Sequence, residues 1–85
     1  MNEIITCSGA KHYNIPSSIS VEHKFFKCGE IFVRLKDSIR DNNVTILQGF
    51  ELPNTHIIEL LLTIDACRRA GCKEITVILP ILPYS

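Results

Sequence analysis

The sequence predicts a small α/β domain that contains a mostly parallel sheet. Two apolar segments rich in β-branched residues, 44–48 and 74–80, have the composition of buried strands. Between them, residues 56–71 carry apolar side chains at the spacing of a helix face. Two strands joined through a helix are most simply parallel neighbours with a right-handed crossover. The length of 85 residues suits one domain.

The chain opens with a short predicted strand, residues 3–9, which ends at Gly9. Residues 10–18 follow as a predicted loop, because Pro16 and the serines after it interrupt regular structure. This interval is too short for a full helix with its connections. We therefore expect the first strand to lead through a loop into the next pair of strands.

Two further segments, residues 18–26 and 30–37, predict a β-hairpin with a short turn that contains Gly29. Successive side chains of a strand point to opposite faces. One face of the second hairpin strand is expected to carry Ile31, Val33 and Leu35, and the other face Phe32, Arg34 and Lys36.

Both ends of the helix carry sequence signals. Asn54 or Thr55 is expected to cap its start, because a short polar side chain accepts hydrogen bonds from the unpaired N–H groups of the first turn. Arg68 and Arg69 suit the negative end of the helix dipole. Gly71 is expected to end the helix in a left-handed conformation.

The helix has a wide apolar surface. Its predicted core face consists of Ile57, Leu60, Leu61, Ile64 and Cys67, with a second stripe of Ile58, Leu62 and Ala66 beside it. The polar positions are mainly Glu59, Thr63, Asp65, Arg68 and Arg69. Burial of each large apolar side chain contributes roughly 1.5–3 kcal/mol. An Asp65–Arg69 pair adds a few tenths of a kcal/mol at most, so packing is expected to dominate the stability of this unit.

Composition argues against several classes of partner. The chain has nine basic and nine acidic residues, which disfavours a nucleic-acid-binding arm or a polybasic membrane patch. No apolar run approaches the roughly 20 residues that span a bilayer, and the N-terminus lacks the pattern of a secretory signal. We expect a cytoplasmic protein with no nucleic-acid and no membrane partner.

The four cysteines are Cys7, Cys28, Cys67 and Cys72, and they form no CxxC pair. The three histidines are scattered, so the spacing argues against a zinc site. Cys7 and Cys67 fall in predicted buried elements, where free cysteine behaves as a small hydrophobic residue. We expect four reduced thiols and no metal.

The sheet also predicts where ligands and partners lie. Parallel sheets bind ligands at the carboxyl ends of their strands, which are expected here at residues 7–9, 48–50 and 80–85. No closing helix follows the last strand, so one edge and one face of the sheet would lack cover. We expect another chain or another copy to supply this cover, and hence self-association.

Five stretches resemble the N-terminal portion of ribose-phosphate pyrophosphokinase, also called phosphoribosyl pyrophosphate synthetase. Residues 8–9 are similar to the start of the family sequences, and residues 26–30 resemble the family's Phe-Ser-Asp-Gly-Glu loop. Residues 37–40 resemble its Glu-Ser-Val/Ile-Arg segment. Residues 54–70 look like its Met-Glu-Leu-Leu helix, and residues 80–85 are similar to its Pro-Tyr-Phe-Gly-Tyr-Ala segment. The resemblance covers nearly the whole chain.

The resemblance implies a fold and an activity. Residues 1–85 would form a single, incomplete N-terminal domain of the phosphoribosyltransferase type. Family members transfer the diphosphoryl group of ATP to ribose 5-phosphate with Mg²⁺, which yields phosphoribosyl pyrophosphate and AMP for nucleotide biosynthesis. ATP and Mg²⁺ are cofactors of the family rather than of this chain alone. Family members assemble as dimers and hexamers, so a homo-oligomer, or pairing with full-length family subunits, is implied.

The loop matched by residues 26–30 reaches into a neighbouring subunit in the family and holds the adenine of ATP. If these family roles apply to this chain, Phe26 would stack on the base, and Cys28 and Glu30 would meet its polar edge. Gly29 would complete the loop. No catalytic residue and no metal ligand is carried over. Structural interpretations remain open: Phe26 also suits packing in a core or interface, and Glu30 suits a solvated position.

Ser38 and Arg40 match positions near a regulatory phosphate site of the family. Arginine fits such a site, because its planar guanidinium binds phosphate oxygens bidentately. The structural alternative is a turn in which Arg40 pairs with the adjacent Asp41.

The chain departs from the family in several places. Cys28 replaces an aspartate, and the interval between residues 9 and 26 is too short for the family's first helix. The sequence ends before the family's Arg-Gln-Asp-Arg motif, so we predict no turnover by these residues alone. The alternatives are a truncated, non-catalytic remnant that acts as an oligomerisation or regulatory module, and a small nucleotide-binding or oligomerising α/β domain.

Overall fold

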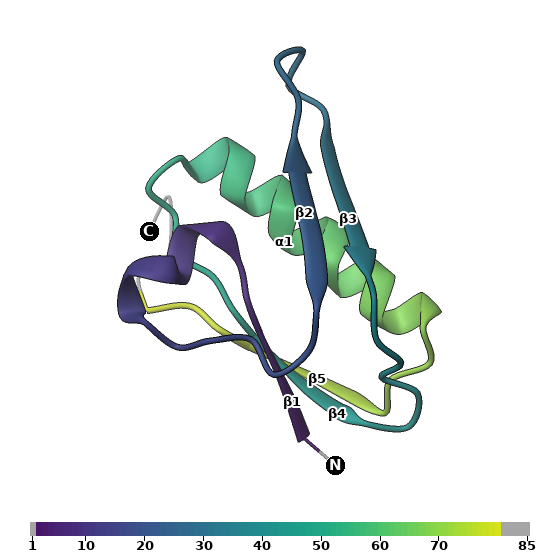
Figure 1. Ribbon diagram of the computed structural model, residues 1–85. Helices are drawn as coiled ribbons and strands as arrows, with labels where there is room; N and C mark the ends of the chain where they lie inside the picture. The colour runs from purple at the N-terminus through teal and green to yellow at the C-terminus, as the bar shows by residue number, and fades with distance from the viewer. Residues whose placement is uncertain (1, 81–85) are drawn as a thin grey trace.

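The computed structural model describes residues 2–80 and has the expected α/β class (Figure 1). Residues 81–85, which include most of one predicted ligand-binding strand end, lie outside the described residues. The elements are β1 (Asn2–Thr6), η1 (Ser8–Tyr13), β2 (Val21–Phe25), β3 (Ile31–Leu35), β4 (Asn43–Leu47), α1 (Pro53–Arg69) and β5 (Glu74–Ile78).

The parallel sheet has the strand order β1-β4-β5. Ile5 of β1 lies opposite Ile46 of β4, and Val44 of β4 lies opposite Ile75 of β5. The predicted strands around the helix are therefore parallel neighbours, as expected. In this order β4 is the central strand, so its carboxyl end is flanked by the ends of both neighbours.

The hairpin forms a second sheet of its own. β2 and β3 pair antiparallel, with Val21 opposite Leu35 and Phe25 opposite Ile31. β3 runs beside α1, and the closed end of the hairpin stands clear of the rest of the molecule (Figure 1). Ile31, Val33 and Leu35 are half-buried whereas Phe32, Arg34 and Lys36 are exposed, which confirms the predicted faces.

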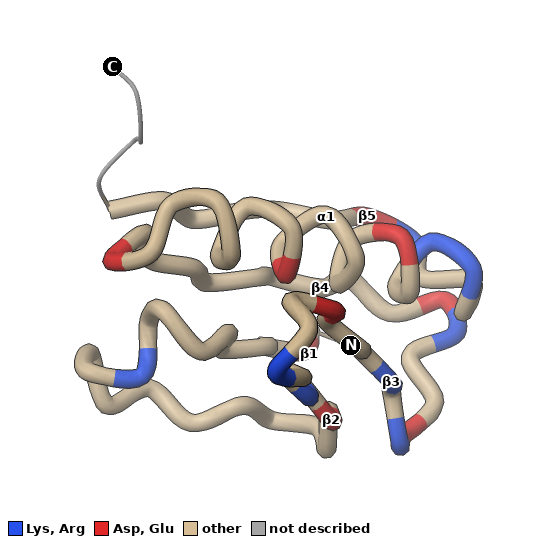
Figure 2. The backbone as a smooth tube through the Cα atoms, turned by 90° about the horizontal axis from the view of Figure 1, so that it is seen from above, with Lys and Arg blue, Asp and Glu red and all other residues tan. Residues whose placement is uncertain are grey.

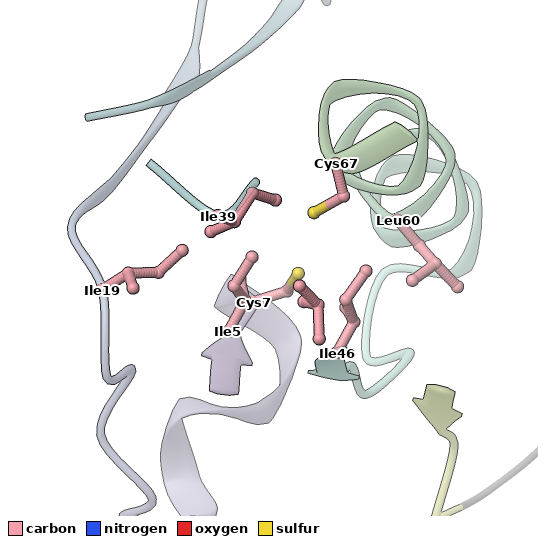
Figure 3. Close-up of a cluster of buried hydrophobic side chains, with 8 residues drawn as sticks. Ile5, Cys7, Ile19, Ile39, Ile46, Leu60 and Cys67 are labelled. Atoms are coloured by element: carbon pink, nitrogen blue, oxygen red, sulfur yellow. The ribbon is translucent and has the colours of Figure 1, made fainter. Parts of the chain in front are cut away.

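The core lies where the parallel sheet, the helix and the ends of the hairpin meet (Figure 3). Its buried members are Ile5, Cys7, Ile19, Ile39, Val44, Ile46, Leu60 and Cys67. Each large side chain of this cluster contributes roughly 1.5–3 kcal/mol of burial free energy. Because the hairpin shares no backbone ladder with the parallel sheet, these apolar contacts are a main link between the two sheets.

The predicted end of the helix is confirmed. Gly71 has a φ of 82°, and its N–H donates to the carbonyl oxygen of Arg68 at 3.1 Å. The N–H of Cys72 donates to the carbonyl oxygen of Cys67 at 3.3 Å. This pair of bonds is the Schellman motif, which satisfies the last carbonyl groups of a helix.

The predicted start of the helix is wrong by a few residues. The helix begins at Pro53, and the capping position is Leu52, which has no side-chain cap. Asn54 and Thr55 therefore lie inside the first turn. Proline suits the first helical position because its missing N–H would have no partner inside the helix. The His56 Nδ1 atom accepts from the N–H of Leu52 at 3.2 Å.

The predicted division of the helix into faces is wrong at four positions. Glu59 and Thr63 are fully buried, whereas Leu61 is 59% exposed and Ile58 is 48% exposed. Apolar residues occur on nearly every side of this helix, so their period alone does not select the buried face. Thr63 Oγ1 donates to the carbonyl oxygen of Glu59 within the helix, whereas the Glu59 carboxylate is bound by donors outside the helix, which the sequence pattern does not reveal.

The segment after β1 also differs from the prediction. η1 is a short 3₁₀ helix where a loop was expected, and Asn14, directly after it, has a φ of 58°. The N–H of Ala10 donates to the carbonyl oxygen of Cys7 at 3.0 Å, and the N–H of Asn14 donates to that of Lys11 at 3.0 Å. A 3₁₀ helix closes in three residues, so it fits an interval that is too short for an α-helix.

Charged residues are spread over the helix, the hairpin and the turns rather than gathered on one element (Figure 2). Within residues 2–80, no helix combines the length and the apolar character needed to cross a membrane. The absence of a nucleic-acid partner stays a prediction.

Candidate functional site

The predicted adenine loop is the turn that closes the hairpin. The N–H of Phe26 donates to the carbonyl oxygen of Glu30 at 2.9 Å, and the N–H of Gly29 donates to that of Phe26 at 3.0 Å. Gly29 has a φ of 92°, a conformation that side-chain-bearing residues rarely adopt. The turn therefore needs glycine at this position, and it leaves Cys28 at an exposed corner.

The loop presents an aromatic side chain to its surroundings. Phe26 is 49% exposed, and Phe25 and Phe32 on the adjoining strands are 45% and 41% exposed. Within residues 2–80, Phe26 is therefore not packed into the core. An exposed ring at the tip of a ribbon has one face available for another molecule.

Ser38 and Arg40 lie in the turn between β3 and β4, on either side of Ile39. Ile39 is fully buried and anchors the turn, so its two neighbours are held at the surface. The Ser38 Oγ atom lies 3.5 Å from the N–H of Arg40. Within residues 2–80 no carboxylate pairs with Arg40, so the predicted alternative of an Arg40–Asp41 ion pair does not form.

The structure does not bring these two predicted sites together. The adenine loop lies at one end of β3, and the turn with Ser38 and Arg40 follows the other end (Figure 1). The full strand Ile31–Leu35 separates them. Each site therefore has to be tested separately.

A second group of polar residues gathers at the carboxyl ends of β1 and β4, as expected for a parallel sheet. The fully buried Gln48 accepts from the N–H of Gly9 at 3.0 Å and from its own neighbour Gly49 at 3.1 Å, both through Oε1. Its Nε2 atom donates to the carbonyl oxygen of His56 at 3.0 Å and to Glu59 at 2.8 Å.

Glu59 is the centre of this network. Its Oε1 atom accepts from Ser8 Oγ at 2.7 Å as well as from Gln48, and its Oε2 atom accepts from the N–H of Ser8 at 3.0 Å. A buried carboxylate is stable only when such donors replace water. Sequence reasoning missed this residue, although a lone glutamate between apolar pairs, Ile57–Ile58 and Leu60–Leu61, was a signal for a buried partner.

Cys7, His23 and Thr63 adjoin this carboxylate. His23 Nε2 lies 3.5 Å from Glu59 Oε2, 4.0 Å from Cys7 Sγ and 3.4 Å from Thr63 Oγ1. Burial, reinforced by the Glu59 charge, raises the pKa of the Cys7 thiol to about 12. Burial also lowers the pKa of His23, an effect that the Glu59 carboxylate opposes. Similarly, burial raises the pKa of Cys67 to about 11.

An open hollow of about 510 Å³ lies beside the end of β1 and the segment after η1. Its lining residues are Thr6, Lys11, Asn14, Ile15, Pro16 and Ser17. None of them belongs to either predicted site, so the hollow gives no support to the adenine loop.

The parallel sheet, the crossover helix and the projecting hairpin define an α/β domain with a two-stranded arm. The sequence-family model for the N-terminal domain of ribose phosphate pyrophosphokinase matches residues 4–85 of this chain. The chain therefore belongs to this family of N-terminal domains, as the resemblance indicated.

Individual proteins that are similar in sequence to this chain support its assignment to the family. The chain is 46% identical over 66 residues to ribose-phosphate pyrophosphokinase 2, chloroplastic, of Spinacia oleracea, covering 76% of this chain and 17% of the relative. It is 36% identical over 85 residues to the ribose-phosphate pyrophosphokinase of Brucella melitensis, covering 99% of this chain and 27% of the relative. The chain thus spans about a quarter or less of these relatives.

A solved structure supports the same conclusion for the fold. The crystal structure of phosphoribosylpyrophosphate synthetase from Mycobacterium smegmatis superposes with a TM-score of 0.84 at 32% sequence identity. The match covers 98% of this chain and 30% of that one. The phosphoribosyltransferase-type fold predicted from the resemblance is therefore confirmed for this domain.

Proposed function

We propose that this chain is the nucleotide-presenting N-terminal part of a cytoplasmic ribose-phosphate pyrophosphokinase. The reaction would be the transfer of the diphosphoryl group of ATP to ribose 5-phosphate in nucleotide biosynthesis. The observation that supports this role is the exposed hairpin loop with Phe26 at its tip, on a chain that belongs to the family. Residues 1–85 would be a single partial domain of the whole enzyme.

The loop fits an adenine in three respects. The Phe26 ring is half exposed and free to stack on a base, and the turn geometry at Gly29 keeps the loop narrow. Glu30 follows the turn with its side chain exposed, where it can accept from an amino group of the base. Cys28 is the weak point, because a thiol accepts hydrogen bonds less well than the aspartate of the resembled loop.

These residues alone are not expected to complete phosphoryl transfer. The reaction depends on positioning and on cations that neutralise the developing charge. Within residues 2–80 the clustered potential metal ligands, Cys7, His23 and Glu59, lie in the interior rather than on the loop. We therefore propose that ATP is bound through the loop, whereas Mg²⁺ and the transfer step require parts of the enzyme beyond these residues.

The turn between β3 and β4 is proposed as a contact for a regulatory phosphate. Arg40 is exposed and carries no ion pair within residues 2–80, and the Ser38 hydroxyl lies beside it. A guanidinium with free N–H groups binds phosphate oxygens in a bidentate manner. The separation of this turn from the adenine loop suits an effector site rather than a substrate site.

The adenine role is tested by ATP binding to the wild-type chain and to Phe26→Ala, measured by calorimetry. Base–aromatic stacking contributes about 1–3 kcal/mol, so the Kd for ATP should rise by roughly 5- to 150-fold. Phe32→Ala is the matched control, because it removes a similarly exposed phenylalanine from the same hairpin. It should leave the Kd within about twofold of wild type.

A gain-of-function variant sharpens the same experiment. Cys28→Asp should lower the Kd for ATP, because a carboxylate accepts from an adenine amino group more strongly than a thiol does. Position 28 is exposed, so the folded structure should tolerate the change. Equal Kd values for wild type, Phe26→Ala and Cys28→Asp would exclude the loop as the adenine site.

An interaction role is the second candidate, supported by apolar side chains that the described residues leave uncovered. Ile58 and Leu61 on α1 are 48% and 59% exposed, and Ile78 on β5 is 48% exposed. Such exposure is typical of a surface that another subunit covers. We propose that a second copy, or a full-length family subunit, packs here, whether or not the chain binds ATP.

Sedimentation of the chain over a range of concentrations tests this assembly. We expect a dimer or larger species in the wild type, and a shift toward monomer in Leu61→Glu. Arg68→Glu, at an exposed position of the same helix, is the control and should leave the distribution unchanged. A wild-type chain that remains monomeric at high concentration would contradict the proposal.

A further inference from the structure

Four side-chain atoms capable of binding a metal lie close together in the core. They belong to Cys7 after β1, His23 on β2, and Glu59 and Thr63 on α1. The ligand atoms of the cysteine, the histidine and the glutamate lie within 4.8 Å of one another. Thr63 Oγ1 lies 3.8 Å from Cys7 Sγ and 3.4 Å from His23 Nε2. These residues are not part of the proposed adenine loop.

The separations between these atoms are longer than most direct hydrogen bonds, and Thr63 Oγ1 itself donates to the carbonyl oxygen of Glu59 at 2.8 Å. Direct hydrogen bonds between nitrogen and oxygen are roughly 2.7–3.2 Å long. Tetrahedral zinc sites, with bonds of about 2.0–2.3 Å, place their ligand atoms roughly 3.3–3.6 Å apart. The separations that involve His23 Nε2 are 3.4, 3.5 and 4.0 Å. A contraction of a few tenths of an ångström at Cys7 would bring its separation from His23 into this range.

The histidine orientation distinguishes a metal site from a catalytic relay. In a nucleophile–histidine–carboxylate triad, one imidazole nitrogen faces the nucleophile and the other faces the carboxylate. Here the same atom, His23 Nε2, faces both Cys7 Sγ and Glu59 Oε2. Cys7 is also fully buried, so a substrate has no access to its sulfur. Convergence on one nitrogen is the arrangement that coordination requires.

The carboxylate is already held in place for this purpose. Glu59 Oε1 accepts two hydrogen bonds, from Ser8 Oγ and Gln48 Nε2, at 2.7 and 2.8 Å. Among residues 2–80, Oε2 accepts a single hydrogen bond, from the N–H of Ser8 at 3.0 Å, and this oxygen lies 3.5 Å from His23 Nε2. Residues that fix a ligand in this way are a general feature of metal sites.

We infer that Cys7, His23 and Glu59 bind one divalent transition-metal ion of the zinc type, with the Thr63 hydroxyl or a water beside it as the fourth ligand. Sulfur, imidazole and carboxylate together are the ligand types that zinc accepts. On binding, the thiol proton of Cys7 passes to solvent and the thiolate sulfur bonds to the metal. The sequence argument against zinc relied on spacing along the chain, whereas this proposal relies on the arrangement of the side chains in space.

Such an ion would join three parts of the fold. Cys7 follows strand β1 of the parallel sheet, His23 belongs to the hairpin, and Glu59 belongs to the helix that lies beside the hairpin. The hairpin has no backbone ladder to the parallel sheet. A metal at this position would therefore fix the base of the hairpin whose tip carries Phe26.

The test is a titration of the full chain with Co²⁺, followed by displacement with Zn²⁺. We expect one equivalent of Co²⁺ to give tetrahedral visible bands and thiolate-to-cobalt absorption in the near ultraviolet. Zn²⁺ should abolish these bands and raise the melting temperature, because a ligand that binds the folded state stabilises it. Metal bound only at exposed side chains would give neither a one-equivalent end point nor a thiolate band, and would overturn the proposal.

Variants assign the ligands. Cys7→Ala should abolish the thiolate band, and His23→Gln should weaken Co²⁺ binding by more than the roughly 10- to 100-fold that is typical when a residue behind a ligand is changed. His23→Gln is the decisive variant if Cys7→Ala fails to fold, because glutamine keeps a polar side chain at a position whose side chain is 11% exposed rather than fully buried. Cys28→Ser and His12→Gln, at exposed positions of the same residue types, should keep the bands. Bands that persist in folded His23→Gln would overturn the assignment.

Discussion

Replacing Glu59 by alanine is expected to lower the free energy of unfolding by about 3 kcal/mol. The change leaves Gln48 Nε2 and the N–H and hydroxyl of Ser8 without their carboxylate acceptor. Each unsatisfied buried polar group costs roughly 1–3 kcal/mol. Because a whole domain is stabilised by only about 5–15 kcal/mol, this variant should lie close to the limit of folding.

Urea denaturation followed by circular dichroism measures this effect in chain that is kept free of metal with a chelator. Asp65→Ala is the matched control, since it removes an exposed carboxylate from the same helix. The Asp65–Arg69 pair, with a distance of 2.9 Å, is a surface ion pair, so its loss should cost under about 1 kcal/mol. If Glu59→Ala cost no more than Asp65→Ala, the buried network would not be a source of stability.

The unit from β4 to β5 could be predicted because each part depends on local pattern. Apolar strands, a helical period and Gly71 at the helix end all act over a few residues. The hairpin faces followed from simple alternation for the same reason. The helix start was displaced, because Pro53 can begin a helix without the polar cap that the prediction sought at Asn54 or Thr55.

The buried polar network could not be predicted from period alone. A pattern of apolar residues locates a helix, but α1 has apolar residues on both its exposed and its buried sides, including Leu61 and Leu60. The side that is buried is decided by partners from elsewhere. Gln48 and Ser8 provide donors at the ends of β4 and β1, and Glu59 turns toward them.

The two kinds of candidate site differ in what the sequence could reveal. The adenine loop and the Ser38–Arg40 turn were predicted from contiguous motifs by resemblance, and their functions stay predictions. The cluster of Cys7, His23 and Glu59 comes from three elements distant along the chain, and no spacing rule for metal motifs covers it. Only the packing of α1 and the hairpin side by side against the parallel sheet brings these side chains together.

Gly9→Ala is expected to lower the free energy of unfolding by about 3 kcal/mol, the upper end for an overpacked site. A Cβ on Gly9 would overlap with the carbonyl oxygen of Gly49 and would crowd the Gln48 Oε1 atom, which would lie 2.7 Å away. Gly9 itself does not have a positive φ, so the cost is steric and arises from contact between the ends of β1 and β4.

Gly29→Ala provides the contrast that isolates this cause, measured by urea denaturation in parallel. A Cβ on Gly29 meets nothing within 4 Å, but its φ of 92° disfavours any side chain, at a cost of about 1–2 kcal/mol. Gly9→Ala should therefore be the more destabilising of the two, and it should also disturb Gln48, whose Oε1 atom accepts from the N–H of Gly9. A Gly9→Ala chain as stable as wild type would mean that the strand ends do not approach each other, and the network around Glu59 would lose its geometric basis.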